Sequence, residues 1–158
     1  MGIKHTPKIF YLSCDLNEYN YDSFKEYVPV LKKIQEKHKR NFRLIVIGDD
    51  PKKYYPKITI EYTHLKKGSI VHKYKNIVKS TADCHLVLNK KTEYYINSET
   101  ICDYVERGVF SIPIISMKTY PYNQKIVNGE NGFLLNARKD LIKIVDSNIN
   151  DKIPLQEI

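Results

Sequence analysis

The chain has 158 residues, 42% of them hydrophobic, and carries 26 basic against 18 acidic residues for a net charge of +8. A chain of this length forms one domain with a single core, which we place at residues 1–150, with a tail at 151–158. No apolar run approaches the ~20 residues that span a bilayer, and the amino terminus lacks the apolar core of a signal peptide. We therefore expect a cytoplasmic globular protein.

The positive charge is concentrated in one segment of the chain. Between Lys52 and Lys79 there are eight lysines and a single acid, Glu61. This segment has two interpretations: a solvated face of a lysine-rich protein, or a patch that binds an anionic membrane surface or another acidic partner. All but four of the 26 basic residues are lysines, a bias that base composition of the coding sequence can produce. We therefore do not expect nucleic acid as a partner.

Short continuous apolar runs, which are typical of buried parallel strands, recur along the chain. They are IFYL (9–12), RLIVIG (43–48), ITIEY (58–62), CHLVL (84–88), IPIIS (112–116) and GFLL (132–135). Helical patterns separate most of these runs. The alternation predicts an α/β fold, namely a Rossmann-like doubly wound parallel sheet of about six strands with helices on both faces.

Four segments show a helical spacing of apolar residues. Asp22 or Ser23 is the start signal of the first, but Pro29 lies inside the pattern and does not suit a helix interior, so we expect the helix to begin or bend at Pro29. Ser69 caps the second helix and Asn97 or Ser98 caps the third, while the fourth runs from about residue 137 to 148. The residues expected to face the core are Phe24, Tyr27, Val28, Leu31 and Ile34 in the first helix and Leu141, Ile144 and Val145 in the last.

In such a sheet, ligands bind beyond the carboxyl ends of the strands, where helix amino termini present unpaired N–H groups. No G-x-G-x-x-G follows the first strand and no Walker motif occurs, so neither a dinucleotide site nor a P-loop is expected. His64, His72 and His85 lack the spacing of zinc ligands, and we expect no metal site. The pair Asp49-Asp50 is interpreted as a solvated loop. The candidate ligand segments are residues 13–17, 48–51, 63–69, 89–100 and 117–123.

Part of the sequence resembles the carboxyl-terminal half of GT-B glycosyltransferases of the large retaining group four. The resemblance is carried by NSETICDYVERG, IPIIS and YPYNQKIVNGENGFLL within residues 97–135. That family shows a Ser, a Lys and a Glu-Tyr pair on one helix, then Gly-hydrophobic-Pro-Val-Ile, a Pro-Tyr loop, a short helix ending in Gly, and Asn-Gly before the last strand. The opening KIFYLSCDLNEYNYDSFKEYVPVLKKI and LIVIGDD fit the first two strands, so the resemblance spans about residues 8–148.

The resemblance implies that a nucleotide-sugar, such as a UDP- or GDP-sugar, binds as donor substrate without a further cofactor. The helix beginning near Ser98 would aim N–H groups at the diphosphate, and the carboxylate of Asp103 would accept both hydroxyls of a ribose. The expected donor-binding residues are Asn97, Ser98, Glu99, Thr100, Asp103, Tyr120 and Tyr122, with Lys90 and Lys91 as phosphate contacts.

Several positions depart from the family pattern. The family usually carries an Arg and a Lys after the first strand, where this chain has CDLNEYN. The helix Lys of the family falls at Thr100, and the first acid of its E-x7-E pattern falls at Tyr95. Losing two or three cations that face a diphosphate weakens binding by several kcal/mol, at roughly 1.5–3 kcal/mol per charged hydrogen bond.

Two functions therefore stay open. The chain is either the donor-binding half of a retaining-type glycosyltransferase, or a non-catalytic binding or scaffold domain that kept the fold. The first function implies polysaccharide or glycolipid synthesis together with an amino-terminal GT-B domain, in cis or in trans. It also implies an inactive isolated chain, and the lysine segment would then contact the inner membrane face peripherally. A receiver-like signalling domain matches only loosely, at Cys14-Asp15 and Met117-Lys118.

Overall fold

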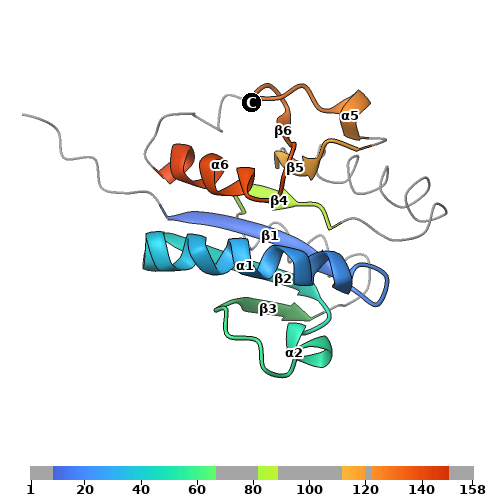
Figure 1. Ribbon diagram of the computed structural model, residues 1–158, viewed down its shortest axis with the longest axis vertical. Helices are drawn as coiled ribbons and strands as arrows, with labels where there is room; N and C mark the ends of the chain where they lie inside the picture. The colour runs from blue at the N-terminus through green and yellow to red at the C-terminus, as the bar shows by residue number, and fades with distance from the viewer. Residues whose placement is uncertain (1–8, 67–81, 89–111, 120–121, 150–158) are drawn as a thin grey trace, which may run out of the picture.

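The computed structural model describes residues 9–66, 82–88, 112–119 and 122–149 (Figure 1). Six strands form one sheet in the order β3-β2-β1-β4-β5-β6, and every neighbouring pair is parallel. This strand order is that of a Rossmann-like α/β domain, as the sequence predicts. The strands are β1 (Phe10–Leu16), β2 (Phe42–Gly48), β3 (Thr63–Lys66), β4 (Cys84–Leu86), β5 (Ile114–Met117) and β6 (Gly132–Leu135).

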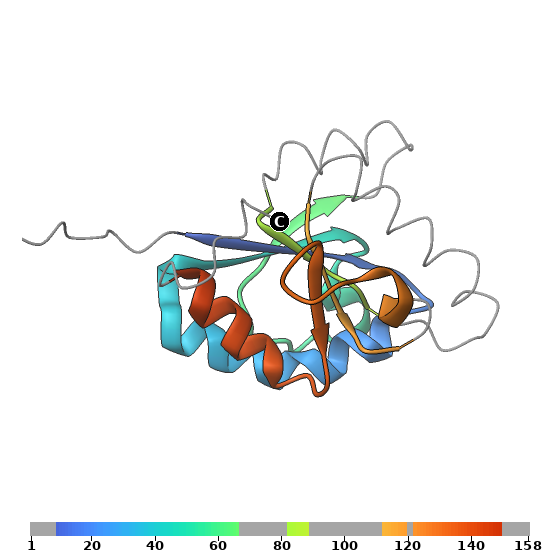
Figure 2. The same cartoon turned by 90° about the horizontal axis from the view of Figure 1, so that it is seen from above.

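Two long helices, α1 (Tyr21–His38) and α6 (Asp140–Ile149), lie side by side on one face of the sheet (Figure 2). Two short helices, α2 (Pro51–Tyr54) and α5 (Tyr122–Lys125), and the 3-10 turn η1 (Lys39–Asn41) complete the described elements. The predicted helices that start at Ser69 and at Asn97 lie outside the described residues.

The core between these two helices and the sheet is built from alternating strand residues. On β1, Phe10, Leu12, Cys14 and Leu16 belong to this core and are at most 2% exposed. The facing side of α1 contributes residues spaced three and four apart, which is the spacing of one helix face. They are Phe24, Tyr27, Leu31 and Ile34, each at most 1% exposed, while Val28 is partly buried.

Helix α1 starts at Tyr21, within two residues of the start signal predicted at Asp22 or Ser23. Of the two alternatives for Pro29, a start there is therefore wrong, because the helix begins eight residues earlier and contains the proline. Pro29 removes one main-chain N–H donor from a helix interior, which is costly. Two large core residues, Phe24 and Tyr27, lie before it and are fully buried only if this first part is helical. Their burial, worth about 1.5–3 kcal/mol each, offsets the proline, whose ring lies on the exposed side of α1.

The third strand is displaced from its predicted position. We expected it at 58–62, whereas β3 spans Thr63–Lys66. The apolar residues of that run pack into the core between α1 and the sheet without forming a strand, and Ile60 there is only 5% exposed. The main chain of Glu61 is held by the side chain of Gln35 on α1 instead of by β2. A prediction from the apolar run alone therefore puts this strand about five residues too early in the chain.

Two smaller boundaries also differ from prediction. Strand β1 continues to Leu16 rather than ending at residue 12, because Ser13 and Asp15 occupy alternate positions that interrupt the apolar run. The last helix begins at Asp140 rather than near 137, since the Asp140 carboxylate accepts hydrogen bonds from the N–H groups of Asn136 and Ala137 and ends the preceding turn.

A carboxylate joins the two long helices. Asp146 on α6 accepts a hydrogen bond from Lys37 at 2.6 Å and pairs with Nε2 of His38 at 2.5 Å. Burial acts to raise the pKa of Asp146, but the hydrogen bonds from Lys37 and His38 outweigh it and hold that pKa below its usual value. The ionised carboxylate therefore stabilises the contact between α1 and α6.

We expect Asp146→Asn to lower the free energy of unfolding at pH 7 by about 1 kcal/mol, a modest value because the pair is partly exposed to water. A folded-state pKa below the unfolded value of about 4 means that this contribution is present above pH 4 and is lost as the pH falls through the folded pKa. Urea unfolding at pH 7 and pH 3 should show a gap between wild type and variant that shrinks at pH 3. Glu36→Gln, an exposed acid on α1, is the control. A gap that is unchanged at pH 3 would contradict this assignment.

Candidate functional site

The candidate site lies at the carboxyl edge of the sheet, where the strand order reverses. From β1 the chain proceeds outward to β2 and β3, then crosses back to β4 on the other side of β1. The loops after β1 and β4 therefore diverge, and this is the point at which open α/β sheets bind ligands. The described part of this edge comprises residues 17–20 after β1, 49–50 after β2, 87–88 after β4, 118–119 after β5 and 136–139 after β6.

The loop after β1 is closed by its own side chains. Asn17 Oδ1 accepts from the N–H of Tyr19, and Asn20 Oδ1 accepts from the N–H of Asn17, both at 2.8 Å. The Asn20 amide also donates to the carbonyl of Asp15 at 2.8 Å, and Asn20 is 3% exposed. Asn20 thus turns back onto the loop and does not cap α1 with its side chain.

The closed loop after β1 offers few hydrogen-bond donors to an anion. The N–H groups of Asn17 and Tyr19 are already occupied, and the exposed charged residue in the loop is the acid Glu18. A diphosphate needs hydrogen-bond donors or cations, and main-chain N–H groups are the usual donors at such an edge. The loop where the GT-B family usually places an Arg and a Lys therefore adds little to a phosphate site in this chain.

The loop after β2 depends on Gly48. Its φ is +110°, and an added Cβ would lie 2.5 Å from the carbonyl oxygen of Leu16, in direct conflict with the end of β1. The same carbonyl accepts the N–H of Asp49 at 2.9 Å. Glycine at this position therefore lets the ends of β1 and β2 come together.

The acid pair after β2 is not simply solvated, as the sequence interpretation had it. Asp49 accepts a hydrogen bond from the hydroxyl of Tyr54 at 2.5 Å, and Asp50 accepts from the hydroxyl of Tyr62 at 2.6 Å and from the N–H of Lys52. The two carboxylates thus fix the first turn of α2 and the chain leading into β3. Sequence reasoning missed these contacts because the tyrosine partners lie 5 and 12 residues away.

The same hydrogen bonds, together with burial, shift the pKa values of Asp50, Tyr54 and Tyr62. Burial, followed by the hydrogen bond to Asp50, raises the pKa of Tyr62 to about 12. Burial and the hydrogen bond to Asp49 raise the pKa of Tyr54 well above its usual value. The hydrogen bond from Tyr62 in turn holds the pKa of Asp50 below its usual value. At neutral pH the two tyrosines therefore keep their protons and donate, and Asp50 is a charged acceptor.

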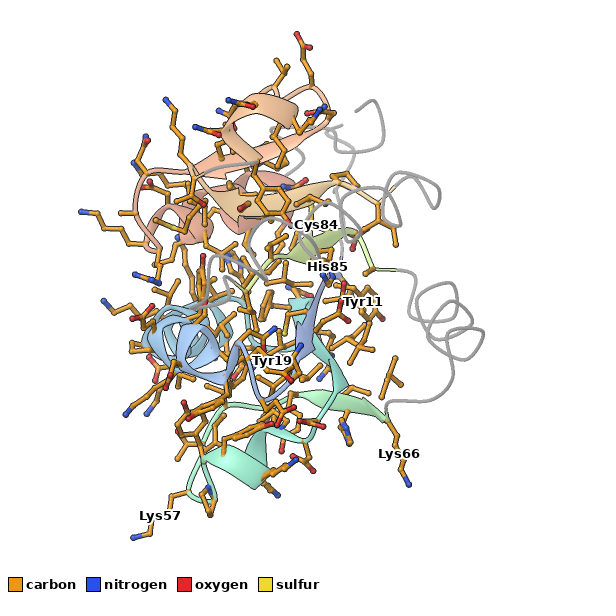
Figure 3. The ribbon with its side chains drawn as sticks, turned by 90° about the vertical axis from the view of Figure 1, so that its right-hand side faces the viewer. Tyr11, Tyr19, Lys57, Lys66, Cys84 and His85 are labelled. Atoms are coloured by element: carbon orange, nitrogen blue, oxygen red, sulfur yellow. The ribbon has the colours of Figure 1, made fainter. Side chains whose placement is uncertain are left out.

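A buried polar cluster lies behind this edge on the central strands. Ser13 Oγ and His85 Nδ1 are 2.8 Å apart, and His85 Nε2 lies 3.7 Å from Asp15 Oδ2. His85 is labelled in Figure 3. Ser13 and His85 are at most 1% exposed, so neither reaches a substrate. The register of β1 with β4 places Ser13 opposite His85. Alternation along β1 could have shown that Ser13 and Asp15 share the face away from α1, but not that His85 joins them.

Of the predicted donor-binding residues, Tyr122 is described by the structure. It is the first residue of α5, is 1% exposed, and its ring packs with Val87, Ile114 and Ile126. The ring is therefore part of the core and does not form an open wall of a crevice. The other predicted residues lie outside the described part of the chain: Asn97, Ser98, Glu99, Thr100, Asp103, Tyr120, Lys90 and Lys91.

The turn between α5 and β6 has the local structure that its sequence predicts. Gly129 adopts a φ of +83°, the left-handed region that favours glycine. Asn131 closes the turn, because its Oδ1 accepts from the N–H of Val127 at 2.8 Å and its Nδ2 donates to the carbonyl of Lys125 at 3.0 Å. Strand β6 then starts at Gly132 and pairs with β5.

Comparison with known proteins shows no matching family model and no matching curated protein. Solved structures do match. TarM aligns with a TM-score of 0.69 at 11% identity over 98% of this chain and 31% of TarM. The carboxyl-terminal domain of LpcC, a glycosyl transferase group 1 family protein from Francisella tularensis, aligns with a TM-score of 0.60 at 13% identity, over 96% of this chain and 80% of that domain. Anabaena HepE in complex with UDP and glucose aligns with a TM-score of 0.60 at 14% identity, over 90% of this chain and 39% of HepE.

These matches define the fold as that of the carboxyl-terminal domain of GT-B glycosyltransferases of group 1, the retaining group four named above. The resemblance found in the sequence is confirmed at the level of the fold, and identities this low show the fold alone. The chain spans well under half the length of TarM and HepE. Within the described ranges, no helix is long and apolar enough to cross a membrane, and no group of three His, Cys, Asp or Glu side chains is placed to hold a metal ion.

We expect Gly48→Ala to be much more destabilising than Gly129→Ala. Both glycines have positive φ, so an alanine costs of order 1 kcal/mol at either site from backbone strain. At Gly129 the new Cβ meets nothing within 4 Å, whereas at Gly48 it meets the Leu16 carbonyl. Displacing β1 from β2 should add about 2 kcal/mol or more to the loss. Urea unfolding of the two variants measures the difference, and equal losses would show that the contact between β1 and the Gly48 turn is not restrictive.

Proposed function

We propose that this chain is the donor-binding half of a retaining-type GT-B glycosyltransferase, which takes a UDP- or GDP-sugar and works with a second, acceptor-binding GT-B domain in cis or in trans. The observation that carries the proposal is the match to HepE over 90% of this chain, because that structure contains UDP and glucose. Hexosyl transfer in polysaccharide or glycolipid synthesis is the reaction class that the resemblance implies.

The donor would lie at the point where the loops after β1 and β4 diverge. In this arrangement the helix predicted from Ser98 directs its N–H groups at the diphosphate, and Asp103 accepts the ribose hydroxyls. Since the loop after β1 supplies no cation, the compensating charge has to come from elsewhere. Lys90 and Lys91 are proposed for that role, and Lys118, exposed at the end of β5, is a further cation at the same edge.

A second candidate function is a binding or scaffold domain that kept the fold without transferase activity. The closed Asn17–Asn20 loop favours it, because the N–H groups of Asn17, Tyr19 and Asn20 are occupied within the loop and its exposed charge, on Glu18, is negative. The two functions differ in what the assembled protein does. A donor half together with its acceptor domain transfers sugar, whereas a scaffold binds its ligand without turnover.

Nucleotide titration tests the proposed donor site. We expect UDP or GDP to bind at millimolar affinity and to shift backbone NMR signals of residues 97–104. Asp103→Asn should weaken binding by roughly tenfold, since it removes one charged acceptor of the ribose. Glu130→Gln, in the exposed turn before β6, is the matched control and should leave the affinity unchanged. No perturbation of residues 97–104 at millimolar nucleotide would contradict the donor assignment.

The lysine segment is proposed as a contact with anionic lipid at the cytoplasmic membrane face. Its described lysines, Lys52, Lys53, Lys57 and Lys66, are all exposed, and the first three belong to or closely follow α2 at one end of the long axis of the molecule (Figures 1 and 3). Tyr54 and Tyr55 lie between them, and aromatic rings beside lysines suit a membrane interface.

We expect the protein to sediment with vesicles that contain 30% phosphatidylglycerol at low salt, and to be released at high salt. Each lysine near an anionic surface contributes about 1 kcal/mol, so the triple variant Lys52→Gln, Lys53→Gln, Lys57→Gln should lose most of the binding. The control is Lys32→Gln, Lys33→Gln, Lys143→Gln, which makes the same charge change at exposed positions of α1 and α6. Equal and negligible binding to neutral and anionic vesicles would contradict the membrane contact and favour the interpretation of the segment as a solvated face.

A further inference from the structure

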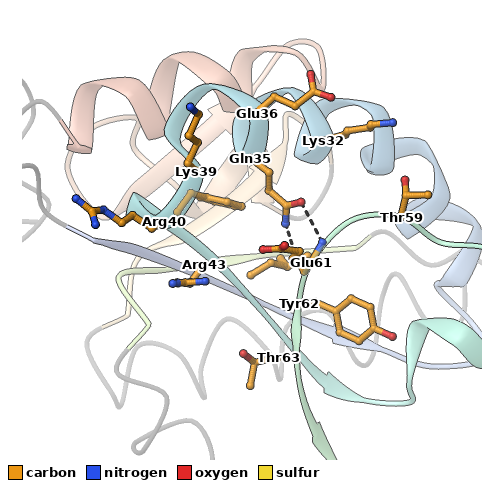
Figure 4. Close-up of a pocket in the computed structure, with 12 residues that line it drawn as sticks. Lys32, Gln35, Glu36, Lys39, Arg40, Arg43, Thr59, Glu61, Tyr62 and Thr63 are labelled. Carbon is orange, nitrogen blue, oxygen red and sulfur yellow. Dashed lines mark hydrogen bonds between the residues drawn. The ribbon is translucent and has the colours of Figure 1, made fainter.

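A cavity of about 580 Å³ lies at the end of the sheet opposite the candidate donor site. It is bounded by the carboxyl-terminal half of α1, by the first residues of β2, and by the chain from Thr59 to Thr63 (Figure 4). Gly48 marks the carboxyl end of β2, whereas this cavity lies at Phe42–Leu44, where the strand begins. Neither the fold nor the proposed donor site assigns it a role.

The cavity exposes a short length of sheet edge. Strand β3 pairs with β2 from Ile45 opposite Thr63 to Gly48 opposite Lys66. Among the residues that the structure describes, Phe42, Arg43 and Leu44 pair with β1 alone. A strand edge of this kind presents main-chain N–H and C=O groups that another extended chain can pair with.

The side chain of Gln35 keeps this edge open. If the register of β3 continued backward, Glu61 would lie opposite Arg43. Instead Gln35 Nε2 donates to the carbonyl of Glu61 at 2.5 Å, and Gln35 Oε1 accepts the Glu61 N–H at 3.0 Å. Both main-chain groups that would pair with β2 are thereby held by α1, as the dashed lines in Figure 4 show. The gap is therefore fixed by two specific hydrogen bonds.

The charges around the gap are mostly positive. Four basic side chains line it against two acids, Glu36 and Glu61. Lys32 and Lys39 come from α1 and η1, on the side of the sheet that Phe42 and Leu44 face. Arg43 alternates with these two core residues and so projects from the opposite face. Cations consequently flank the open edge on both faces of the sheet, with Arg40 as the fourth.

We propose that this edge is a docking site for an extended acidic segment of a partner protein, which adds to the sheet as a strand beside Phe42–Leu44. Main-chain pairing supplies the affinity in this mode, and alternate side chains supply the specificity. The side chains of an added strand point alternately to the two faces, so acids on one face meet Arg43 and acids on the other meet Lys32 and Lys39. A small anion would use the cations but not the main-chain edge, and the experiment separates the two.

The probe is a fluorescent eight-residue peptide of the repeat Glu-Glu-Val-Val, which places acids on both faces of an added strand, titrated into the full chain at low salt. Its control is the same peptide with every amide N-methylated, which keeps the charges and removes the donors. We expect the unmodified peptide to bind at least ~10-fold more tightly and to slow hydrogen exchange of the Phe42–Leu44 amides. Arg40→Gln with Arg43→Gln should weaken it roughly tenfold. Lys25→Gln with Lys57→Gln removes the same charge elsewhere and should change binding less than about twofold.

Four results would overturn the proposal. They are equal binding of the two peptides, equal weakening by the two double variants, no binding at millimolar peptide, and displacement of the peptide by inorganic phosphate at the same concentration as by unlabelled peptide. The last result would assign the cavity to a small anion. Because the test measures neither nucleotide binding nor sugar transfer, its outcome is independent of the proposed donor function.

Discussion

Burial of both faces of β1 is the constraint on which the rest of the structure depends. One row of its side chains packs into the core beneath α1 and α6, and the other row carries Ser13, which is fully buried beside His85. A strand buried on both faces belongs in the middle of a parallel sheet, with partners on each side. That position makes β1 the boundary between the two directions of winding, and the carboxyl end of β1 is where a ligand crevice forms.

The residues at that end show how the fold can persist while the chemistry of the site changes. Gly48 and the Leu16 carbonyl fix the geometry of the edge, and this contact concerns the backbone alone. The Asn17–Asn20 loop engages three of its main-chain N–H groups, those of Asn17, Tyr19 and Asn20, within itself. A self-contained loop stabilises the apo protein, but it offers a diphosphate fewer donors. Any donor affinity in this chain therefore depends on the segments after β4 and β5.

Periodicity predicted the parts of the fold that depend on local burial. The α1 face of Phe24, Tyr27, Leu31 and Ile34 and the strand GFLL were predicted correctly, because spacing along the chain decides which side of an element is apolar. The errors came from contacts distant in sequence. The hydrogen bonds from Gln35 hold Glu61 away from β2, so that β3 begins at Thr63. Burial of Phe24 and Tyr27 stabilises the part of α1 that precedes Pro29. In the site, pairing of β1 with β4 joined Ser13 to His85 across 72 residues, which no local pattern indicates.

The proposed function requires a nucleoside diphosphate to bind at the carboxyl edge between β1 and β4. A crystal structure of the chain grown with millimolar UDP tests it most directly. We expect density for the nucleotide beyond the ends of β1 and β4, with the diphosphate away from the closed Asn17–Asn20 loop and next to a helix amino terminus. Density for UDP at the opposite end of the sheet would contradict the proposed site. So would the absence of UDP density at the carboxyl edge in a crystal in which no neighbouring molecule covers that edge.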